Sequence, residues 1–429
     1  MTDVLFGTSG IRRKVEDISG EFVADLALAL GTCSADEIIA VGMDCRESSP
    51  RIKEQFISAL NTSGKNAVDL GLVPTPTVAM ASEQYGTSVV VTASHNPPEY
   101  NGFKFWSGGR AYSPNQENVL EKTFRSKEFN RVKVSGTKKE LVDYLIKHRE
   151  RILKKVGLLS SEVKILIDCA NGAGSVITPS LLEEMGCRVK AINTETSGLF
   201  PHGLEPTEEN LRETCSIVRK SGVDVAVAHD GDADRTAAID SEGRLVDWDS
   251  FLSVLAYGKN KVVTTVDASM RVEEVCGEVI RTPVGDVSVA NAVDREGADF
   301  GGEPSGSFIF PQVHLFPDGV LTAAVTARMV SENRFYEILD EVSDYPTMRV
   351  KIPCEETEKR KIMESVLKNA ERMDYELSTI DGVRLSAEEG WFLIRPSGTE
   401  SFIRITAEAT TKKKLKQLVR EGRKMLDVT

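Results

Sequence analysis

Short apolar runs alternate with stretches of helical period along most of the chain, and this alternation predicts strands and helices in turn. Continuous apolar runs of this length are typical of strands that are buried in the sheets of α/β proteins. The runs predicted as strands are residues 37–44, 87–92, 163–168 and 223–228. The pattern therefore predicts α/β domains over at least the first half of the chain.

A predicted helix follows the first of these strands and ends at Leu60. Ser48 offers an N-cap for it, and Pro50 falls near the first turn, where proline is tolerated. Its apolar positions recur on one face, which predicts that this face packs against a sheet. These positions are Ile52, Phe56, Ile57 and Leu60.

The charged stretch 138–155 has helical period, and we interpret it as a linker helix that closes a first domain. The strand–turn pattern restarts after it and again near Asp249, where a helical stretch precedes a strand at 261–267. From Tyr345 the pattern changes to that of an α+β domain, with helices on one side of an antiparallel sheet. Its strands are predicted at 347–354, 391–398 and 401–409, and its helices at 355–373 and from Thr411.

The composition agrees with a globular protein of several domains. The chain has 429 residues, of which 41% are hydrophobic and 28% are charged. A single core rarely grows past ~300 residues, so one domain is not expected. The net charge of −12 disfavours nucleic acid and anionic membranes as partners, whereas a small phosphorylated substrate needs only a local basic pocket.

No apolar run has the length of a transmembrane helix, and the first residues lack the basic start and apolar stretch of a signal peptide. The seven cysteines are odd in number and widely spaced, and they form no Cys-x-x-Cys pair. Neither a disulfide framework nor a zinc site is indicated. We therefore expect a cytoplasmic protein.

Three carboxylates stand at alternate positions directly after the predicted strand 223–228: Asp230, Asp232 and Asp234. In a loop that opens from a strand, this spacing can bring several oxygens onto one hard cation such as Mg²⁺. Clustered carboxylates repel one another unless a cation or several donors lie between them. We therefore favour a metal site here over a solvated acidic turn.

Two other motifs compete for this segment. A calcium loop is excluded, because Arg235 and Ser241 stand where that loop needs a glycine and a bidentate glutamate. The pattern Asp232-x-Asp234-x-Thr236 after a strand also fits the haloacid-dehalogenase-type phosphatases, in which an aspartate takes up the phosphoryl group. The residues alone leave this alternative open, with Asp232 as the nucleophile.

Ser94 stands just past the predicted strand 87–92 and is followed by His95, Asn96 and two prolines that stop the strand. We expect Ser94 to be exposed at the carboxyl edge of the sheet, where α/β folds bind their ligands. His95 could move protons or orient a phosphate. An ordinary turn that caps the strand fits these residues equally well.

Two glycine-containing segments offer groups for a phosphate and for a sugar. The segment Arg395-Pro396-Ser397-Gly398-Thr399 provides a guanidinium fork, two hydroxyls and approachable backbone N–H groups, which together suit a phosphate. The segment Gly301-Gly302-Glu303-Pro304-Ser305-Gly306 provides a carboxylate and a hydroxyl that suit vicinal sugar hydroxyls. Both compositions also occur in ordinary turns.

Taken together, these segments closely resemble the α-D-phosphohexomutases, the family that includes phosphoglucomutase, phosphomannomutase and phosphoglucosamine mutase. The resemblance covers essentially the whole chain, and the motifs occur in the family's order. They are Phe6-Gly7-Thr8-Ser9-Gly10-Ile11-Arg12, Gly42-x-Asp44-x-Arg46, Pro74-Thr75-Pro76, Thr92-Ala93-Ser94-His95-Asn96-Pro97, Asn101-Gly102-Phe103-Lys104, Asp230-Gly231-Asp232-Ala233-Asp234-Arg235, Gly302-Glu303-Pro304-Ser305-Gly306 and Arg395-Pro396-Ser397-Gly398-Thr399-Glu400.

The resemblance implies an α/β fold of four domains around a central cleft, with three similar mixed-sheet domains followed by a C-terminal α+β domain. The phosphoserine loop would lie in residues 1–155 and the metal-binding loop in 156–248. The sugar-binding loop would lie in 249–344 and the phosphate-binding loop in 345–429.

The resemblance also implies the role of each site residue. Ser94 would be the phosphoserine, and one Mg²⁺ would be held by Ser94 and the three aspartates. The substrate would be a small phosphosugar, with a bisphosphorylated sugar as intermediate and activator, in a monomer or homodimer. The groups around the transferring phosphoryl would be Arg12, His95, Lys104 and Arg235, those on the sugar hydroxyls Glu303 and Ser305, and those on the non-reacting phosphate Arg395, Ser397, Gly398 and Thr399.

The sequence departs from the family at two positions where relatives carry a histidine. Ser307 follows the sugar loop, and Asp286-Val287 follows the segment 281–285. Both histidines are candidate acid–base groups in relatives, so the group that moves the hydroxyl proton is open. A third departure, Ser401 in place of proline, is expected to be conformational only.

The doubled glycine at 301–302 and the pair Gly285-Asp286 are more similar to phosphoglucosamine mutases, whereas Pro98-Glu99-Tyr100 is more similar to phosphomannomutase/phosphoglucomutases. We therefore favour interconversion of glucosamine 6-phosphate and glucosamine 1-phosphate, with mannose and glucose phosphates as the alternative. A haloacid-dehalogenase-like sugar phosphatase and a non-catalytic sugar-phosphate binder stay open as functions of another class.

Overall fold

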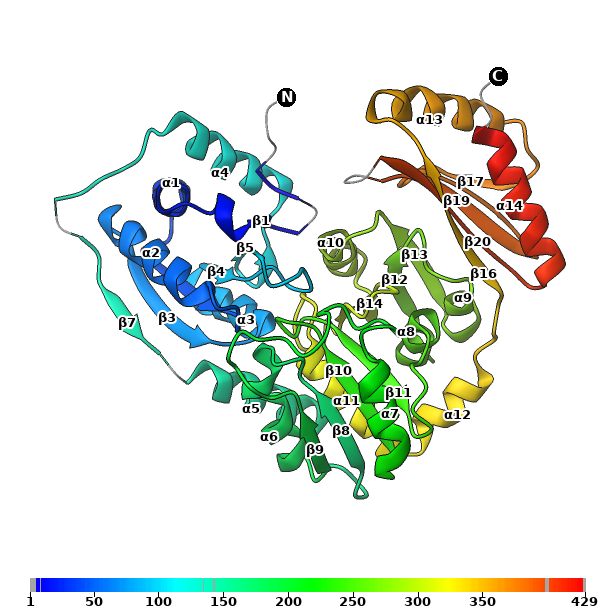
Figure 1. The fold of residues 1–429 in the computed structure, drawn as a ribbon, viewed down its shortest axis with the longest axis horizontal. Coiled ribbons are helices and arrows are strands. Elements are labelled where there is room, and N and C mark those ends of the chain that lie inside the picture. The colour runs from blue at the N-terminus through cyan, green and yellow to red at the C-terminus, as the bar shows by residue number, and fades with distance from the viewer. Residues whose placement is uncertain (1–4, 8, 134, 142, 398–400, 427–429) are drawn as a thin grey trace. The chain divides into compact units, whose positions relative to one another are not determined.

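The computed structural model describes residues 5–7, 9–133, 135–141, 143–397 and 401–426 (Figure 1). The chain forms two compact units. The first comprises Met1–Phe251 with Ser305–Glu337, and the second comprises Leu252–Pro304 with Ile338–Thr429.

The first sheet of the first unit is mixed, and its strands run in the order β1-β5-β4-β2-β3-β7. Strands β4, β2, β3 and β7 are parallel, whereas β5 is antiparallel to both β4 and β1. The short strand β6 (Arg110–Ala111) pairs with β5. The bounds are β1 Ile11–Lys14, β2 Ile38–Met43, β3 Asn66–Leu72, β4 Thr87–Val91, β5 Tyr100–Ser107 and β7 Lys138–Glu140.

Helices cover both faces of this sheet because successive side chains of a strand point to opposite faces. Val41 and Val89 belong to the core that α1, α2 and α4 complete, whereas Ala40 and Val90 pack with α3. The predicted strands at 37–44 and 87–92 and the apolar face of α2 are confirmed. The elements are α1 Gly20–Cys33, α2 Ser49–Thr62, α3 Thr75–Tyr85 and α4 Pro114–Ser126, with a 3-10 turn at Val15–Asp17.

Two expectations about this region are wrong. The linker helix does not begin at 138, because Lys138–Glu140 forms β7 on the edge of β3, and α5 spans only Tyr144–Val156. An edge strand leaves backbone groups unpaired, and pairing with them outweighs the helix preference of three charged residues. Ser48 is the N-cap residue of α2, as the sequence predicts, but the capping hydrogen bond expected from its side chain does not form, and its hydroxyl accepts a hydrogen bond from Asn101 Nδ2 (2.8 Å).

The second sheet of the first unit has the order β11-β10-β8-β9. Strands β10, β8 and β9 are parallel, and β11 runs antiparallel to β10. Helix α7 packs on it through Cys215 and Val218, while α11 contacts β10, β11 and α6. The bounds are β8 Lys164–Asp168, β9 Arg188–Ile192, β10 Val225–His229, β11 Thr236–Asp240, α6 Thr178–Glu184, α7 Arg212–Ser221 and α11 Gly319–Ser331, with a 3-10 turn at Ala173–Val176. The short strand β15 (Phe308–Ile309) is also in the first unit but is not part of this sheet.

The second unit contains a parallel core in which β12 pairs with both β13 and β14. Helix α10 contacts all three of these strands. The predicted strand at 261–267 is confirmed as β12. The bounds are α8 Trp248–Ala256, β12 Lys261–Thr265, α9 Arg271–Val275, β13 Glu278–Thr282, α10 Asp286–Glu296, β14 Phe300–Gly302 and α12 Arg334–Glu341.

The C-terminal part is an antiparallel sheet of order β16-β20-β19-β18-β17, as the change of pattern after Tyr345 predicts. Helices α13 and α14 share one core with Phe392, Ile394 and Ile405, so both lie on the same face of the sheet. The bounds are β16 Thr347–Pro353, α13 Glu356–Ala370, β17 Glu376–Ser378, β18 Val383–Ala387, β19 Gly390–Pro396, β20 Phe402–Ala409 and α14 Lys412–Leu426.

The seven cysteines are free thiols, and most of them are buried. Over the described ranges, no helix combines the length and the apolar character that crossing a bilayer requires.

Gly102 marks a close approach of three strands beside Ser94. A Cβ atom at this position would lie 1.9 Å from the carbonyl oxygen of Ile11 and 3.0 Å from that of Thr92. We therefore expect Gly102→Ala to lower the free energy of unfolding by about 1–3 kcal/mol, as overpacking does. Urea denaturation measures this change.

The matched control is Gly20→Ala at the first position of α1, where the nearest atom, Gln55 Nε2, lies 3.7 Å away. Its stability should stay within about 0.5 kcal/mol of the parent. Equal stability of the two variants would contradict the close approach at Gly102.

Candidate active site and metal centre

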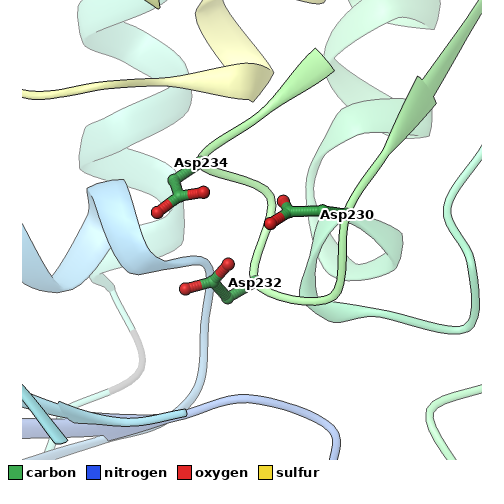
Figure 2. Close-up of side chains that lie close together, drawn as sticks. All are labelled: Asp230, Asp232 and Asp234. Carbon is green, nitrogen blue, oxygen red and sulfur yellow. The ribbon is translucent and has the colours of Figure 1, made fainter. Parts of the chain in front are cut away.

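The three aspartates lie in the short loop that joins β10 to β11, and all three are buried. Their exposed fractions are 0% for Asp230, 0% for Asp232 and 6% for Asp234, which excludes a solvated acidic turn. One carboxylate oxygen of each lies within 4.8 Å of the others. Figure 2 shows the three side chains gathered at this loop. The alternate spacing in the sequence thus becomes one cluster of oxygens.

Backbone hydrogen bonds from three separate segments hold this loop. Thr75 N–H, at the start of α3, donates to Asp232 O (2.9 Å). Gly319 N–H, at the start of α11, donates to Ala233 O (3.1 Å), and Ala173 N–H donates to Gly231 O (2.9 Å). A Cβ on Gly319 would lie 2.5 Å from Arg235 O, so α11 approaches the loop backbone directly. The position of the carboxylates is therefore set from several sides.

Charge repulsion within the cluster is only partly relieved by the protein. Burial, followed by the charges of the two neighbouring aspartates, raises the pKa of Asp230 well above its usual range. Burial and Asp232 likewise raise the pKa of Asp234. Burial opposes ionisation of Asp232 as well, but Lys104 and the Thr75 hydroxyl outweigh it and lower the pKa of Asp232. The cluster thus has the electrostatics of a site that a cation would stabilise.

The oxygens that would bind such a cation can be identified. Lys104 Nζ donates to Oδ2 of both Asp232 (2.9 Å) and Asp234. Oδ1 of each of these two residues is buried and finds no hydrogen-bond partner in the part of the chain that the structure describes. Carboxylate oxygens of this kind are the ligands that Mg²⁺ and Ca²⁺ prefer. The residues present therefore fit a hard divalent cation.

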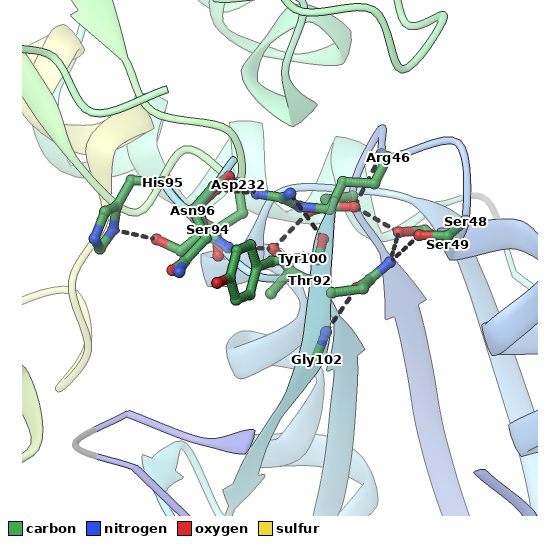
Figure 3. Close-up of polar contacts among 12 residues, drawn as sticks. Arg46, Ser48, Ser49, Thr92, Ser94, His95, Asn96, Tyr100, Gly102 and Asp232 are labelled. Atoms are coloured by element: carbon green, nitrogen blue, oxygen red, sulfur yellow. Dashed lines mark hydrogen bonds and ion pairs between the residues drawn. The ribbon is translucent and has the colours of Figure 1, made fainter. Parts of the chain in front are cut away.

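Ser94 lies against this cluster, and Figure 3 draws the polar contacts of the loop that carries it. Its hydroxyl donates to Asp230 Oδ2 (2.9 Å) and lies 3.3 Å from His95 Nδ1. The expectation that Ser94 is exposed is wrong: only 1% of its surface is accessible, because the loop after β10 covers the end of β4. Its φ of 52° lies in the left-handed region, which is uncommon for a residue other than glycine. The serine is held in an unusual conformation at the acidic cluster.

Several cations surround His95. Burial and then the charges of Arg235, Arg12 and Lys104 lower the pKa of His95 to about 2. This imidazole is therefore neutral near pH 7. Arg12 Nη1 also donates to Asn96 Oδ1 (2.9 Å). The structure thus brings the cations expected around a transferring phosphoryl group to the serine loop.

The expected sugar and phosphate groups lie mostly in the second unit. Glu303 is buried, and its Oε1 accepts a hydrogen bond from Gly285 N–H (2.8 Å). Arg395 Nε donates to Asp381 Oδ1 (2.8 Å), and Ser397 N–H donates to Phe402 O (3.0 Å).

The structure says less about the remaining residues that were predicted to bind the sugar or the phosphate. Ser305 belongs to the first unit, where it is partly exposed. Gly398 and Thr399 lie outside the described residues. At the two positions where the family resemblance leads us to expect histidine, Val287 lies in the first turn of α10, and Ser307 forms a β-bridge with Arg235.

Sequence reasoning assigned no role to Thr75, Asp44 and Arg46, although all three stand in motifs that it quoted. The Thr75 hydroxyl donates to Asp232 Oδ2 (2.6 Å), and Arg46 is buried beside Asp44 below the serine loop. A charged pair directly after a buried strand is the signal that could have drawn attention to them, because buried charges need partners.

Comparison with known proteins places this architecture in a family. The models for the α/β/α domains I, II and III of phosphoglucomutase/phosphomannomutase match residues 3–131, 142–243 and 250–345, and the model for the C-terminal domain matches residues 350–424.

Relatives and solved structures agree with this family assignment. "Probable phosphoglucosamine mutase" of Pyrococcus furiosus is 41% identical, covering 97% of this chain and 96% of its own. "Phosphoglucosamine mutase" of Methanococcus maripaludis is 39% identical, covering 98% of each. The structure of a phosphoglucomutase/phosphomannomutase family protein of Burkholderia thailandensis is similar, with a TM-score of 0.88, 25% identity and coverage of 98% and 96%. The chain belongs to the phosphoglucomutase/phosphomannomutase family, and it is a phosphohexomutase of the isomerase class.

The metal assignment predicts a stability change on binding. We expect Mg²⁺ at about 100 times its Kd to add about 2.7 kcal/mol to the unfolding free energy of chelator-treated protein. Asp234→Asn should lose most of this gain, because it removes one anionic ligand. Without metal, that variant should be at least as stable as the parent, because one repulsive charge is gone. Thermal unfolding with and without Mg²⁺ measures both effects.

The control is Asp240→Asn, at the end of β11, where the carboxylate pairs with Arg244 rather than with the cluster. This variant should keep the Mg²⁺-dependent gain even if its own stability falls. An Mg²⁺ effect that is absent from the parent, or unchanged in Asp234→Asn, would contradict the metal site.

Proposed function

We propose that this protein interconverts glucosamine 6-phosphate and glucosamine 1-phosphate through a phosphoserine at Ser94. The observation that carries the proposal is the Ser94 hydroxyl, buried 2.9 Å from Asp230 at the edge of the acidic cluster. A nucleophile, a hard-cation site and several fixed cations are what phosphoryl transfer needs, since it depends on alignment and charge neutralisation.

The proposed reaction has two phosphoryl transfers. Phosphorylated Ser94 gives its phosphoryl group to the free hydroxyl of the sugar phosphate, which breaks the Ser94 Oγ–P bond and forms a bisphosphorylated sugar. The sugar then presents its other phosphate, and Ser94 Oγ takes that phosphoryl group back as the sugar O–P bond breaks. In each transfer the attacking hydroxyl loses its proton and the leaving oxygen gains one. The enzyme ends as it began, and the phosphate has moved between C1 and C6.

The fixed groups of the first unit would supply charge stabilisation for each transfer. Asp230, Asp232 and Asp234, together with a phosphoryl oxygen on Ser94, would hold one Mg²⁺, which when bound neutralises charge on the phosphoryl group. Arg12, Lys104 and Arg235 add positive charge that is already in place before the reaction. His95, whose lowered pKa keeps its imidazole neutral near pH 7, is available to orient the group or accept a hydrogen bond.

The second unit would supply most of the sugar and phosphate contacts. Glu303 would accept hydrogen bonds from sugar hydroxyls, assisted by Ser305 of the first unit. Arg395, Ser397, Gly398 and Thr399 would hold the phosphate that does not react, through charge-assisted bonds. Because the two phosphates exchange roles during the reaction, this group of residues would accept either end of the sugar.

Each of the four segments expected from the sequence would carry one of these tasks. The enzyme would be a monomer or a homodimer. Residues 1–155 would carry the phosphoserine, 156–248 the metal site, 249–344 the sugar contacts and 345–429 the phosphate contacts. The preference for glucosamine is supported by the names of relatives at about 40% identity over nearly the whole chain.

The phosphoserine is testable by intact mass. The purified protein should carry one phosphoryl group that survives mild alkaline hydroxylamine, and Ser94→Ala should lack it and lose turnover by at least about three orders of magnitude. The control Ser88→Ala removes another buried hydroxyl, which donates to Val78 O (2.7 Å), and it should keep both properties.

Two other results of this experiment would support the alternative functions. A hydroxylamine-labile phosphoryl group on Asp232 supports a haloacid-dehalogenase-like phosphatase. Binding of phosphosugars without phosphorylation or turnover supports a non-catalytic binder.

Substrate preference follows from kcat/KM over a panel of sugar 1-phosphates. We expect glucosamine 1-phosphate to exceed mannose and glucose 1-phosphates by about tenfold or more, equal to about 1.4 kcal/mol of transition-state preference. A tenfold preference in the opposite direction would contradict the glucosamine assignment and leave the mutase mechanism standing.

A further inference from the structure

The loop that carries Ser94 is short of backbone donors. Strand β4 ends at Val91 and β5 begins at Tyr100, and the connection between them contains Pro97 and Pro98. Proline has no N–H group, so the loop has fewer donors than carbonyl acceptors. Buried carbonyl groups need partners, because an unpaired one costs free energy comparable to a lost hydrogen bond.

One buried side chain supplies the missing donors. Arg46 is 1% exposed, and its Nη2 donates to Ser94 O (2.7 Å) and Asn96 O (2.6 Å). Its Nη1 donates to Pro97 O (2.7 Å) and Tyr100 O (2.9 Å). Figure 3 shows Arg46 beside Ser94, Asn96 and Tyr100, with dashed lines running from its guanidinium into the loop. Three carbonyl groups of the loop and that of Tyr100, the first residue of β5, therefore accept hydrogen bonds from a single side chain.

Arg46 is itself oriented by Asp44. Arg46 Nε donates to Asp44 Oδ2 (3.0 Å), so every N–H of the guanidinium has a partner. Asp44 also accepts from Thr92 Oγ1 (2.7 Å), and that hydroxyl accepts from Ser94 N–H (2.9 Å). The chain of bonds from Asp44 thus reaches Ser94 from two sides, through its N–H and through its carbonyl group.

These contacts bear on the conformation that Ser94 needs. Its left-handed φ of 52° costs free energy and persists only where the surroundings enforce it. In a trans peptide the C=O and N–H groups point in opposite directions, so fixing Ser94 O on Arg46 turns the next N–H away from Arg46. The side chain of Ser94 then faces Asp230 and not the interior below the loop.

We infer that Arg46 is a positioning residue for the phosphoryl-transfer reaction: it holds the carbonyl groups of the serine loop so that Ser94 Oγ faces the acidic cluster. The inference rests on the proposed function for its kinetic consequence, although the loop conformation can be measured separately. Arg46 acts through Ser94: within the described residues, its guanidinium donates to Asp44 and to backbone carbonyl groups and not to the three aspartates.

The test is chemical rescue of Arg46→Ala. A misplaced nucleophile should lower kcat by about 100-fold and leave KM within about threefold of the parent value. Millimolar guanidinium chloride, which can occupy the space left by the side chain, should restore kcat by about tenfold. Ammonium chloride at the same concentration should not, because it lacks the planar fork that reaches several carbonyl groups.

Amide hydrogen exchange supplies a readout that does not depend on activity. Exchange over residues 93–101 should be faster in Arg46→Ala and should slow again with guanidinium. Arg51→Ala, which removes an exposed arginine bonded to Gln55, controls for loss of charge. Leu60→Ala, a core truncation on α2, controls for lowered stability, and both controls should keep kcat and show no response to guanidinium.

Wild-type kcat in Arg46→Ala, or a loss of kcat that guanidinium leaves unchanged together with unaltered exchange, would overturn the inference. If Arg46→Ala does not fold, Arg46→Lys keeps the charge with fewer donors and should show an intermediate kcat; full activity in that variant would also overturn it. If the parent protein turns over no phosphosugar, the proposed function fails, and exchange over 93–101 alone decides the role of Arg46.

Discussion

Mutual repulsion of three buried carboxylates is the constraint around which the first unit is built. Asp230, Asp232 and Asp234 come within 4.8 Å of one another with almost no access to water. Such an arrangement forms only where the backbone is fixed independently and the charge is met by cations. Here α3, α11 and the turn after β8 hold the backbone, and Lys104 meets part of the charge. The unmet part is what makes the cluster suitable for a divalent cation.

The contacts that hold the loop of the three aspartates also join the two sheets of the first unit. Thr75 begins α3, which packs on the first sheet, yet both its N–H and its hydroxyl donate to Asp232, which lies in the loop between β10 and β11 of the second sheet. Lys104 on β5 and Ser94 after β4 reach the same loop. The nucleophile and the acidic cluster come from different sheets, so their alignment depends on these few contacts and on the serine loop that Arg46 holds.

Sequence-based expectations were wrong where the outcome depended on a neighbour distant in the chain. The position of Ser94 past a strand was predicted, but its burial results from a loop more than a hundred residues away. Lys138–Glu140 has helical composition and becomes a strand because β3 offers an open edge. Ser48 stands at the start of α2, but Asn101 uses its hydroxyl. Propensity describes the local chain only, and tertiary partners override it.

The sequence by itself determined the alternation of buried strands and amphipathic helices, the antiparallel C-terminal sheet and the family, because hydrophobic period and ordered motifs are local properties of the chain. It also marked Asp230, Asp232 and Asp234 as a candidate cation site from their spacing alone. Only the tertiary structure decided that Lys104 binds one oxygen of Asp232 and one of Asp234, and that the second oxygen of each has no hydrogen-bond partner among the described residues. The tertiary structure alone assigned Arg46 to the loop of Ser94. The guanidinium follows one strand and the carbonyl groups that it binds follow another, about fifty residues later, and no sequence pattern relates the two. Their relation exists only once parallel strands have brought their carboxyl ends to the same edge of the sheet.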